Sequence, residues 1–519
     1  MKNVIVVGLI CFCIVCICAQ GNGSIPAKDI IIGRSFTTNI DIKAKEFVFP
    51  DPIHQWSMND STKVLTLQLR GMKDDGNELN DTGKVLFFDL PTEQIRWEQK
   101  VNYQQSTVEQ HDNILIKTTD NQSSCLNNAT GENLWSIKNS ICYVNPTQKI
   151  GVGYKVKSSG NFTNMLEGTD LRTGQSLWKR KINLDYNLNE ILQLNDSVII
   201  VSASGLHTIH LKNGTGWDYD ALTGKKDHSA TVGANVISFA FSMLLGADFE
   251  TTTGYDLITD VVSNALVDST GIYLADKESI VRLDRDGFVL WKNNLPKKLV
   301  SKSSLFFKDS LICMVNDGFA SLNSESINYG KPFVAAYDKN TGKKLFLNTI
   351  GSKSQQILSF EIQKDTLILL SKNRIFRYSL KDGTELFEQY FKTDSVGEFT
   401  QFGENNMFLI SDSATVKPLL SDSTNLYVVT NKNQLLILNN QLDITNIIPN
   451  DKLCFCYLET KGYKFLDAGE STLVIDKNNK QVAELDILGN VMLIGTKLFE
   501  VQGKSLVEID LDQLIPDGN

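Results

Sequence analysis

Histidine and cysteine are the side chains that most often bind metals or act as nucleophiles, and the histidines of this chain are few. It has five among its 519 residues. The closest pair, His207 and His210, lies in an apolar run that predicts a strand. Residues i and i+3 of a strand face opposite sides, so this pair cannot chelate one ion without distortion. We expect structural or surface histidines and no metal site.

The cysteines also indicate little chemistry. Five follow the N-terminal leader, and an odd number leaves at least one thiol free in an oxidising compartment. Cys454 and Cys456 share one face of a predicted strand, which is poor geometry for a disulfide between them. Pairing of Cys125 with Cys142 across neighbouring strands is possible, but we favour buried free thiols. The five are Cys125, Cys142, Cys313, Cys454 and Cys456.

Other catalytic signatures are missing from the sequence. No glycine-rich phosphate loop leads from a strand into a helix, and no G-x-S-x-G nucleophile turn occurs. The Asp and Asn residues that recur do so at turns, where they have a structural role. We therefore predict no catalytic, cofactor-binding or metal-binding residue and no bound cofactor.

An eleven-residue pattern recurs along the chain. Its cleanest copy, Gly168 to Trp178, reads G-T-D-L-R-T-G-Q-S-L-W. Asp or Asn stands at position three, Thr-Gly or Asp-Gly at six and seven, and a large aromatic residue at eleven. Glycine supplies the positive φ of a tight turn, and Asp or Asn can accept hydrogen bonds from the turn backbone. Each copy therefore predicts a hairpin whose second strand ends on an aromatic ring.

We expect the aromatic rings to be buried between neighbouring repeats, because one hairpin cannot cover such a ring alone. Removing each ring from water contributes on the order of 2–3 kcal/mol. The predicted docking residues are Trp97, Trp135, Trp178, Trp291, Phe346 and Phe387. The predicted turn residues are Asp89, Asn127, Asp170, Asp220 and Asp338, with Gly131, Gly174, Gly224, Gly287, Gly342 and Gly383.

Apolar strands precede each hairpin, for example at 114–116, 198–201 and 367–370. Three visible strands and one weaker strand make a four-stranded unit. The units recur roughly every 40 to 60 residues, which is a propeller spacing. The sequence therefore predicts an all-β repeat fold.

The Ala-x-Asp-x-x-Thr-Gly-x-x-x-Trp pattern resembles the tryptophan-docking repeat of the PQQ-like, or quinoprotein-like, β-propellers. Seven copies lie between Phe87 and Phe387, and three degenerate units follow. The resemblance implies a β-propeller, which we predict to have eight four-stranded blades and a ring closed by terminal strands. In architecture it is also similar to the propeller subunit of the outer-membrane protein assembly machinery.

The quinoprotein-like family includes PQQ-dependent dehydrogenases, many of which have a disulfide between adjacent cysteines. This chain has no adjacent cysteines, and its recurring Asp and Asn residues belong to the turns. We therefore expect a non-catalytic scaffold that binds a protein or another ligand. The alternative is a PQQ-dependent dehydrogenase-like enzyme.

The N-terminus has the three parts of a secretory signal. Lys2 precedes an uncharged apolar run from Val4 to Ala19, and small polar residues follow. We predict a signal peptide at 1–19 cleaved after Ala19, an N-terminal extension at 20–51 and the propeller at 52–515. Each leader cysteine follows a bulky residue, which argues against a lipid anchor. The protein is expected to be secreted or periplasmic.

The charge distribution argues against a nucleic-acid partner. The formal net charge is −9, and Lys179–Lys181 is the densest basic cluster. Phosphate neutralisation needs more clustered cations than this. The longest apolar run after the leader, 236–247, is too short to cross a bilayer. We expect a monomer with a protein partner in the cell envelope or secretory compartment, and no transmembrane span after signal removal.

The longest interruption of the repeat, residues 231–267, is the predicted contact element. It joins an apolar run to the acidic, Thr-rich stretch 248–254. An irregular blade with a buried strand is the other interpretation. The candidate partner-contact residues are Phe239, Phe241, Met243 and Leu244.

Overall fold

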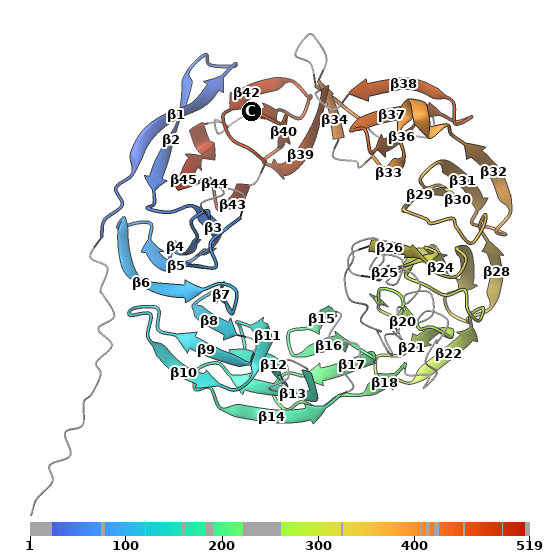
Figure 1. Ribbon diagram of the computed structural model, residues 1–519, viewed down its shortest axis with the longest axis horizontal. Helices are drawn as coiled ribbons and strands as arrows, with labels where there is room; N and C mark the ends of the chain where they lie inside the picture. Colours follow the sequence, from blue (N-terminus) through green and yellow to red (C-terminus); the bar gives the residue numbers. More distant parts are fainter. Residues whose placement is uncertain are drawn as a thin grey trace, which may run out of the picture. The chain divides into compact units, whose positions relative to one another are not determined.

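The computed structural model describes residues 23–513, apart from 74–77, 120, 157–161, 183–189, 222–260, 323–324, 404–406, 411–415, 420–424, 450–451 and 490. Antiparallel strands dominate these residues, and most strands pair with the next strand along the chain (Figure 1). The chain divides into two compact units. Unit 1 comprises the described residues of 1–31, 43–179 and 490–519, and unit 2 those of 32–42 and 180–489.

Unit 1 contains three sheets of four consecutive strands and one sheet that joins the two ends of the chain. The consecutive sheets are β3 (Ile53–Asn59), β4 (Val64–Leu69), β5 (Thr82–Asp89) and β6 (Gln94–Asn102); β7 (Ser106–His111), β8 (Ile114–Thr119), β9 (Gln122–Leu126) and β10 (Asn133–Ile137); and β11 (Ser140–Asn145), β12 (Ile150–Val156), β13 (Phe162–Asp170) and β14 (Ser176–Lys181). The fourth has the order β2 (Asp41–Val48), β45 (Ser505–Asp510), β44 (Lys497–Gln502) and β43 (Val491–Ile494).

Unit 2 continues the same plan, with five four-stranded sheets among its described residues. They are β15 (Glu190–Asn195), β16 (Val198–Ser202), β17 (Gly205–His210) and β18 (Asp218–Asp220); β19 (Leu266–Asp268), β20 (Gly271–Ala275), β21 (Ser279–Leu283) and β22 (Val289–Asn294); β23 (Ser303–Lys308), β24 (Leu311–Asn316), β27 (Phe333–Asp338) and β28 (Lys344–Thr349); β29 (Ser359–Gln363), β30 (Thr366–Leu370), β31 (Arg374–Ser379) and β32 (Glu385–Tyr390); and β33 (Phe399–Phe402), β36 (Asn425–Thr430), β37 (Gln434–Asn439) and β38 (Ile444–Pro449).

The N-terminal strand β1 (Lys28–Ser35) is hydrogen-bonded to β2 on one side and to β42 (Gln481–Leu485) on the other, so these strands belong to one 11-stranded sheet. Gly33 of β1 pairs with Leu485 of β42. The order of this sheet continues from β42 through β41 (Thr472–Ile475), β40 (Tyr463–Asp467), β39 (Leu453–Thr460), β34 (Met407–Ile410) and β35 (Val416–Pro418).

Burial along the strands follows from their places in the sheets. The middle strands β4, β20 and β21 are buried at every position. Strands covered on both faces need apolar residues on both sides, which explains their near-continuous Val, Ile and Leu. The last strands, such as β14 and β22, bury only part of their side chains. The core of each unit therefore lies between successive sheets.

The fold is that of a β-propeller, as predicted, with four-stranded antiparallel sheets as its repeating element. Strands β1 and β2 come from the segment predicted as an N-terminal extension, and they pair within the sheets. The strand that pairs with the last strand, β45, is β2. The closure of one ring of eight blades stays a prediction.

Three additions interrupt the regular plan in unit 2. The hairpin β25 (Phe319–Leu322) and β26 (Glu325–Asn328) lies between β24 and β27 in the chain. The short helix α2 (Thr393–Val396) connects β32 to β33, and the β34–β35 hairpin follows β33. Within the described residues, no helix is long and apolar enough to cross a membrane.

Candidate functional site

Four of the predicted turn residues accept hydrogen bonds from the backbone of their own turns. Oδ1 of Asp170 accepts the N–H of Arg172 at 2.9 Å, and Oδ1 of Asp338 accepts the N–H of Thr341 at 2.8 Å. The bonds from Thr341 lower the pKa of Asp338. Side chains held in this way are occupied by the turn and stabilise it. Equivalent side-chain-to-backbone bonds occur at Asp89 and Asn127.

In unit 1, two predicted tryptophans each pack on the glycine of the following turn. A Cβ atom added to Gly131 would come within 2.8 Å of the Trp97 ring, and one added to Gly174 within 2.7 Å of Trp135. Both glycines have positive φ, +75° and +72°. The two indole N–H groups donate to carbonyls of those turns at 3.0 and 2.9 Å. Each turn thus holds the preceding ring by contact and by a hydrogen bond.

Unit 2 repeats this arrangement. A Cβ on Gly342 would come within 2.6 Å of the Trp291 ring, and a Cβ on Gly383 within 2.5 Å of Phe346. The indole of Trp291 donates to the carbonyl of Lys339 at 3.0 Å. Phe346 has no N–H and makes only the ring contact. Trp97, Trp178, Trp291 and Phe346 are all buried, and Trp135 is half-buried.

An amide two residues after the aromatic residue supports the same contact, and the sequence analysis missed it. Nδ2 of Asn293 donates to the carbonyl of Gly342 at 2.7 Å, and Nδ2 of Asn348 donates to that of Gly383 at 2.6 Å. Gln99 makes the equivalent bond to Gly131. The sequence does contain a pattern that indicates this amide, because each of these copies has Asn or Gln two residues after the aromatic residue that ends the repeat.

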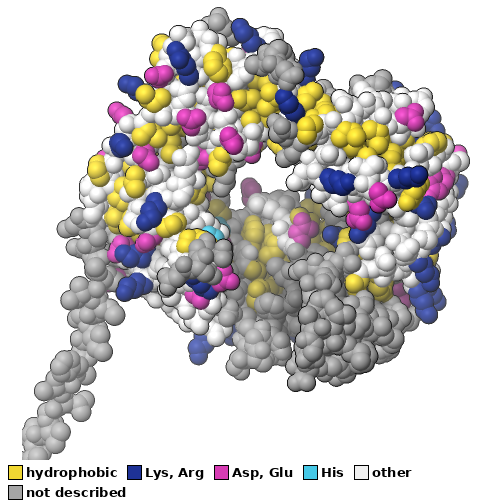
Figure 2. All heavy atoms as spheres, turned by 45° about the horizontal axis from the view of Figure 1, so that its top comes forward, with side chains coloured by type: hydrophobic (Ala, Val, Ile, Leu, Met, Phe, Trp, Pro, Cys, Tyr) yellow, Lys and Arg dark blue, Asp and Glu magenta, His cyan; other side chains and the backbone are white. Residues whose placement is uncertain are grey.

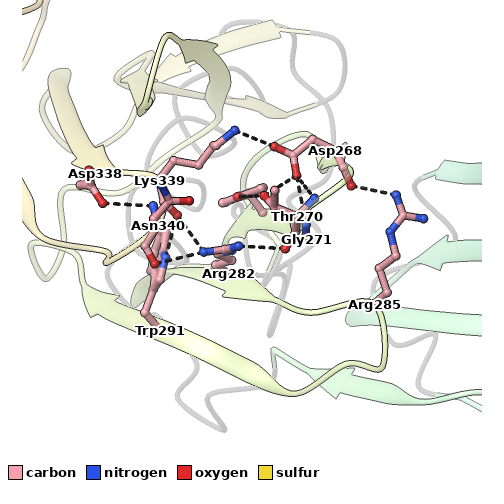
Figure 3. Close-up of polar contacts among 10 residues, drawn as sticks. Asp268, Thr270, Gly271, Arg282, Arg285, Trp291, Asp338, Lys339 and Asn340 are labelled. Carbon is pink, nitrogen blue, oxygen red and sulfur yellow. Dashed lines mark hydrogen bonds and ion pairs between the residues drawn. The ribbon is translucent and has the colours of Figure 1, made fainter.

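A polar network surrounds one of these contacts in unit 2 (Figure 3). Nζ of Lys339 lies 2.9 Å from Oδ2 of Asp268, and both side chains are about four-fifths buried. The guanidinium of Arg282 lies between two turns and donates to the carbonyls of Thr270 at 2.9 Å and Asn340 at 3.0 Å. The network ties the β19–β20 turn to the β27–β28 turn.

The carboxylate of Asp268 is ionised in this network. Burial opposes its ionisation, but hydrogen bonds from Lys339 and Thr270 outweigh burial and lower the pKa of Asp268 to about 2. Arg285 also donates to the carbonyl of Asp268 at 2.8 Å. Asp268 and Lys339 therefore neutralise each other within the fold, and Arg282 and Arg285 donate to backbone carbonyls (Figure 3).

Phe387 departs from the prediction, because it is 41% exposed. The following turn has Leu442 at φ +63°, where the other turns have glycine. Leu442 is itself buried in the core. The turn therefore lacks the glycine surface on which the other rings pack.

One docking residue was not predicted. Trp217 follows a turn at Asn213–Gly214, and a Cβ on Gly287 would come within 2.4 Å of its ring. Its indole donates to the carbonyl of Arg285 at 2.8 Å. The predicted turn residue Asp220 ends β18, and Gly224 lies outside the described residues. So do Phe239, Phe241, Met243 and Leu244.

His207 and His210 both lie on β17, and His207 contacts the neighbouring strand β18. Nδ1 of the buried His207 lies 2.7 Å from Oδ1 of Asp218, which also accepts a hydrogen bond from Arg180 at 2.6 Å. Desolvation is the main cause of the lowered pKa of His207. The part of the chain that the structure describes contains no group of three His, Cys, Asp or Glu side chains placed to hold a metal.

The five cysteines are free thiols. Cys125, Cys313 and Cys454 are buried and Cys456 is half-buried, but Cys142 is exposed, contrary to the expected burial. Cys142 lies at an irregularity in the pairing of β11 with β12, between Ile141 and Tyr143. Its Sγ lies 3.5 Å from the carbonyl oxygen of Val152 on β12.

A polar pocket of about 720 Å³ lies in unit 2 beside the added elements. Side chains from β25 and β26, the β28–β29 connection, the β30–β31 turn and the α2 region line it. The lining includes Phe319, Asn328, Gln356, Lys372, Asn373 and Arg374. Sequence reasoning did not find this site, because its residues come from separate segments.

Lysine and arginine side chains are interspersed with aspartate and glutamate on the face shown in Figure 2.

No family model and no curated protein sequence matches the chain. Among solved structures, it is similar to BamB from Moraxella catarrhalis, with 14% identity, a TM-score of 0.31, and coverage of 78% of this chain and 96% of that one. It is also similar to apo AztD from Citrobacter koseri, with 9% identity, a TM-score of 0.32, and coverage of 70% of this chain and 91% of that one. The Pan2 WD40 domain of Neurospora crassa has 12% identity, a TM-score of 0.28, and coverage of 67% of this chain and 88% of that one. At these values the similarities assign neither a family nor a function to the chain.

Proposed function

We propose that this protein is a non-catalytic, secreted or periplasmic β-propeller that binds a protein partner through the connections between its sheets. The observation that carries the proposal is the contrast between uniform repeats and added elements. The carboxylates of Asp89, Asp170 and Asp338 accept bonds from their own turns, and turn glycines support docked rings. The β25–β26 hairpin, α2 and the β34–β35 hairpin have no counterpart in the repeat. Binding specificity in repeat folds resides in such connections.

The proposal extends to the predicted contact element at 231–267 and its residues Phe239, Phe241, Met243 and Leu244. The secreted or periplasmic location proposed for the protein rests on the predicted leader of residues 1–19, with cleavage after Ala19. The resemblance to PQQ-like repeats supports the choice of a scaffold, since that fold serves many functions besides catalysis.

The contact element can be tested by replacing Phe239, Phe241, Met243 and Leu244 with serine. We expect the variant to lose a protein that the wild type captures from an envelope or secretory extract. Its melting temperature and β-rich circular dichroism should stay near those of wild type. The matched control replaces the buried Leu367 and Leu369 of β30 with serine, which should lower the melting temperature sharply. A similar drop in the contact variant would show that these residues form a blade interior and would overturn the proposal.

A further inference from the structure

The polar pocket beside the added elements has the chemistry of a binding site for a small neutral ligand. Its volume of about 720 Å³ lies within the range of small-molecule sites. Amide and hydroxyl side chains predominate in its lining, with Phe319 and Leu358 as the apolar part. We propose that this pocket binds a neutral oligosaccharide.

The walls of the pocket are held in place by hydrogen bonds within unit 2. The N–H of Ile357 donates to the carbonyl of Asp317 at 2.9 Å, and the N–H of Phe399 donates to that of Lys372 at 2.8 Å. Nε2 of Gln356 donates to Oδ1 of Asn328 at 2.9 Å. A site that is already ordered loses little conformational entropy when a ligand binds.

The charges of the pocket favour a neutral ligand over an anion. Lys372 lies 3.5 Å from Glu398, and Arg374 forms an ion pair with Glu388. Each cation of the lining thus has a carboxylate partner. An anionic ligand would have to compete with that carboxylate.

The uncharged groups of the lining suit sugar hydroxyls, which both donate and accept hydrogen bonds. Asparagine and glutamine offer a carbonyl and an NH₂ group in one plane, and serine and threonine hydroxyls serve in either role. In the part of the chain that the structure describes, the side chains of Asn373 and Thr393 have no hydrogen-bond partner. Phe319 is the aromatic residue of the lining, and Nζ of Lys302 lies 5.8 Å from its ring centroid. A peptide would instead require more apolar surface for its side chains.

The test applies the full-length mature protein to an array of neutral, sulfated and sialylated glycans, followed by calorimetry with the best neutral glycan. We expect neutral glycans to bind. Asn373→Ala and Gln356→Ala should each weaken binding at least tenfold. The matched control is Asn446→Ala, an exposed amide of β38 outside the lining, which should leave the affinity unchanged.

Three results would overturn this inference: no bound glycan, binding of sulfated or sialylated glycans alone, or unchanged binding in both pocket variants. Asn373→Asp keeps the shape of the side chain and removes its donor, so it distinguishes lost contacts from misfolding. It should weaken binding while the melting temperature stays constant. The result is independent of the proposed protein partner, because the array contains no protein ligand.

Discussion

Gly342 and Trp291 show how one residue without a side chain supports the packing of a large ring. The glycine has φ +71°, and an added Cβ would come within 2.6 Å of the indole. We expect Trp291→Ala to lower the free energy of unfolding by about 3–5 kcal/mol, because a buried ring is lost. Gly342→Ala should also destabilise, through strain at positive φ and contact with the ring.

Phe387→Ala is the matched control, since that ring is 41% exposed and the turn after it has Leu442 in place of glycine. Its cost should stay below about 1 kcal/mol. Denaturant unfolding of Trp291→Ala, Gly342→Ala and Phe387→Ala measures the change in the free energy of unfolding for each variant. Equal costs for Trp291→Ala and Phe387→Ala would contradict the docking role of the turn glycine.

The ion pair of Asp268 and Lys339 should make stability depend on pH in the acid range. The pKa of Asp268 is about 2 in the fold, below its ordinary value of 3.8, so its contribution is present above about pH 4 and is lost as the pH falls toward 2. Asp268→Asn should lower the free energy of unfolding by roughly 2 kcal/mol at pH 7. The difference in this free energy between the variant and the wild type should shrink between pH 4 and pH 2.

Asp60→Asn provides the control for this measurement, because Asp60 pairs with Lys63 on the surface and is 77% exposed. Exposed pairs contribute about 0–1 kcal/mol. Thermal melts of both variants across this pH range check the prediction. If the stability difference between Asp268→Asn and the wild type stays constant down to pH 2, the Asp268–Lys339 pair does not titrate as proposed.

At the scale of the element, β2 tests whether a terminal strand is a full member of its sheet. Phe47 faces the core and is 2% exposed, whereas its neighbour Val48 faces solvent and is 54% exposed. Phe47→Ser should lower the free energy of unfolding by at least 3 kcal/mol, and Val48→Ser should change it by less than about 1 kcal/mol. Equal effects in chemical denaturation would mean that β2 lies loosely on β45.

The elements also show what could be predicted from the sequence. The predicted docking residues Trp97, Trp178 and Trp291 lie at buried positions, and each stands at the last position of its eleven-residue repeat. Trp217 was missed, since it follows Gly214 by one residue fewer than Trp178 follows Gly174. β1 and β2 were missed as members of the sheets because their partners β42 and β45 lie at the far end of the chain. The polar pocket depends on tertiary placement of short polar segments that have no pattern of their own.

For the whole molecule, the principal functional prediction is that it does not act as a quinone-dependent dehydrogenase. The carboxylates seen in the repeats already accept hydrogen bonds from their turns. Purified protein mixed with PQQ and calcium should give no dye-linked oxidation of alcohols or sugars, alongside an authentic quinoprotein dehydrogenase as a positive control. Robust turnover that disappears when one Asp is replaced would contradict the scaffold proposal.

The pairing of β2 with β45 affects how the protein is made. Glu46 and Ser505 are hydrogen-bonded across a sequence separation of 459 residues. Contacts of such long range form slowly, because the intervening chain must be brought together first. Strand β2 leaves the ribosome long before its partner β45 and must wait for it. Unit 1 therefore completes its fold only after β45 has been made, and a chain stalled before residue 505 leaves the β45-facing edge of β2 unpaired and open to aggregation.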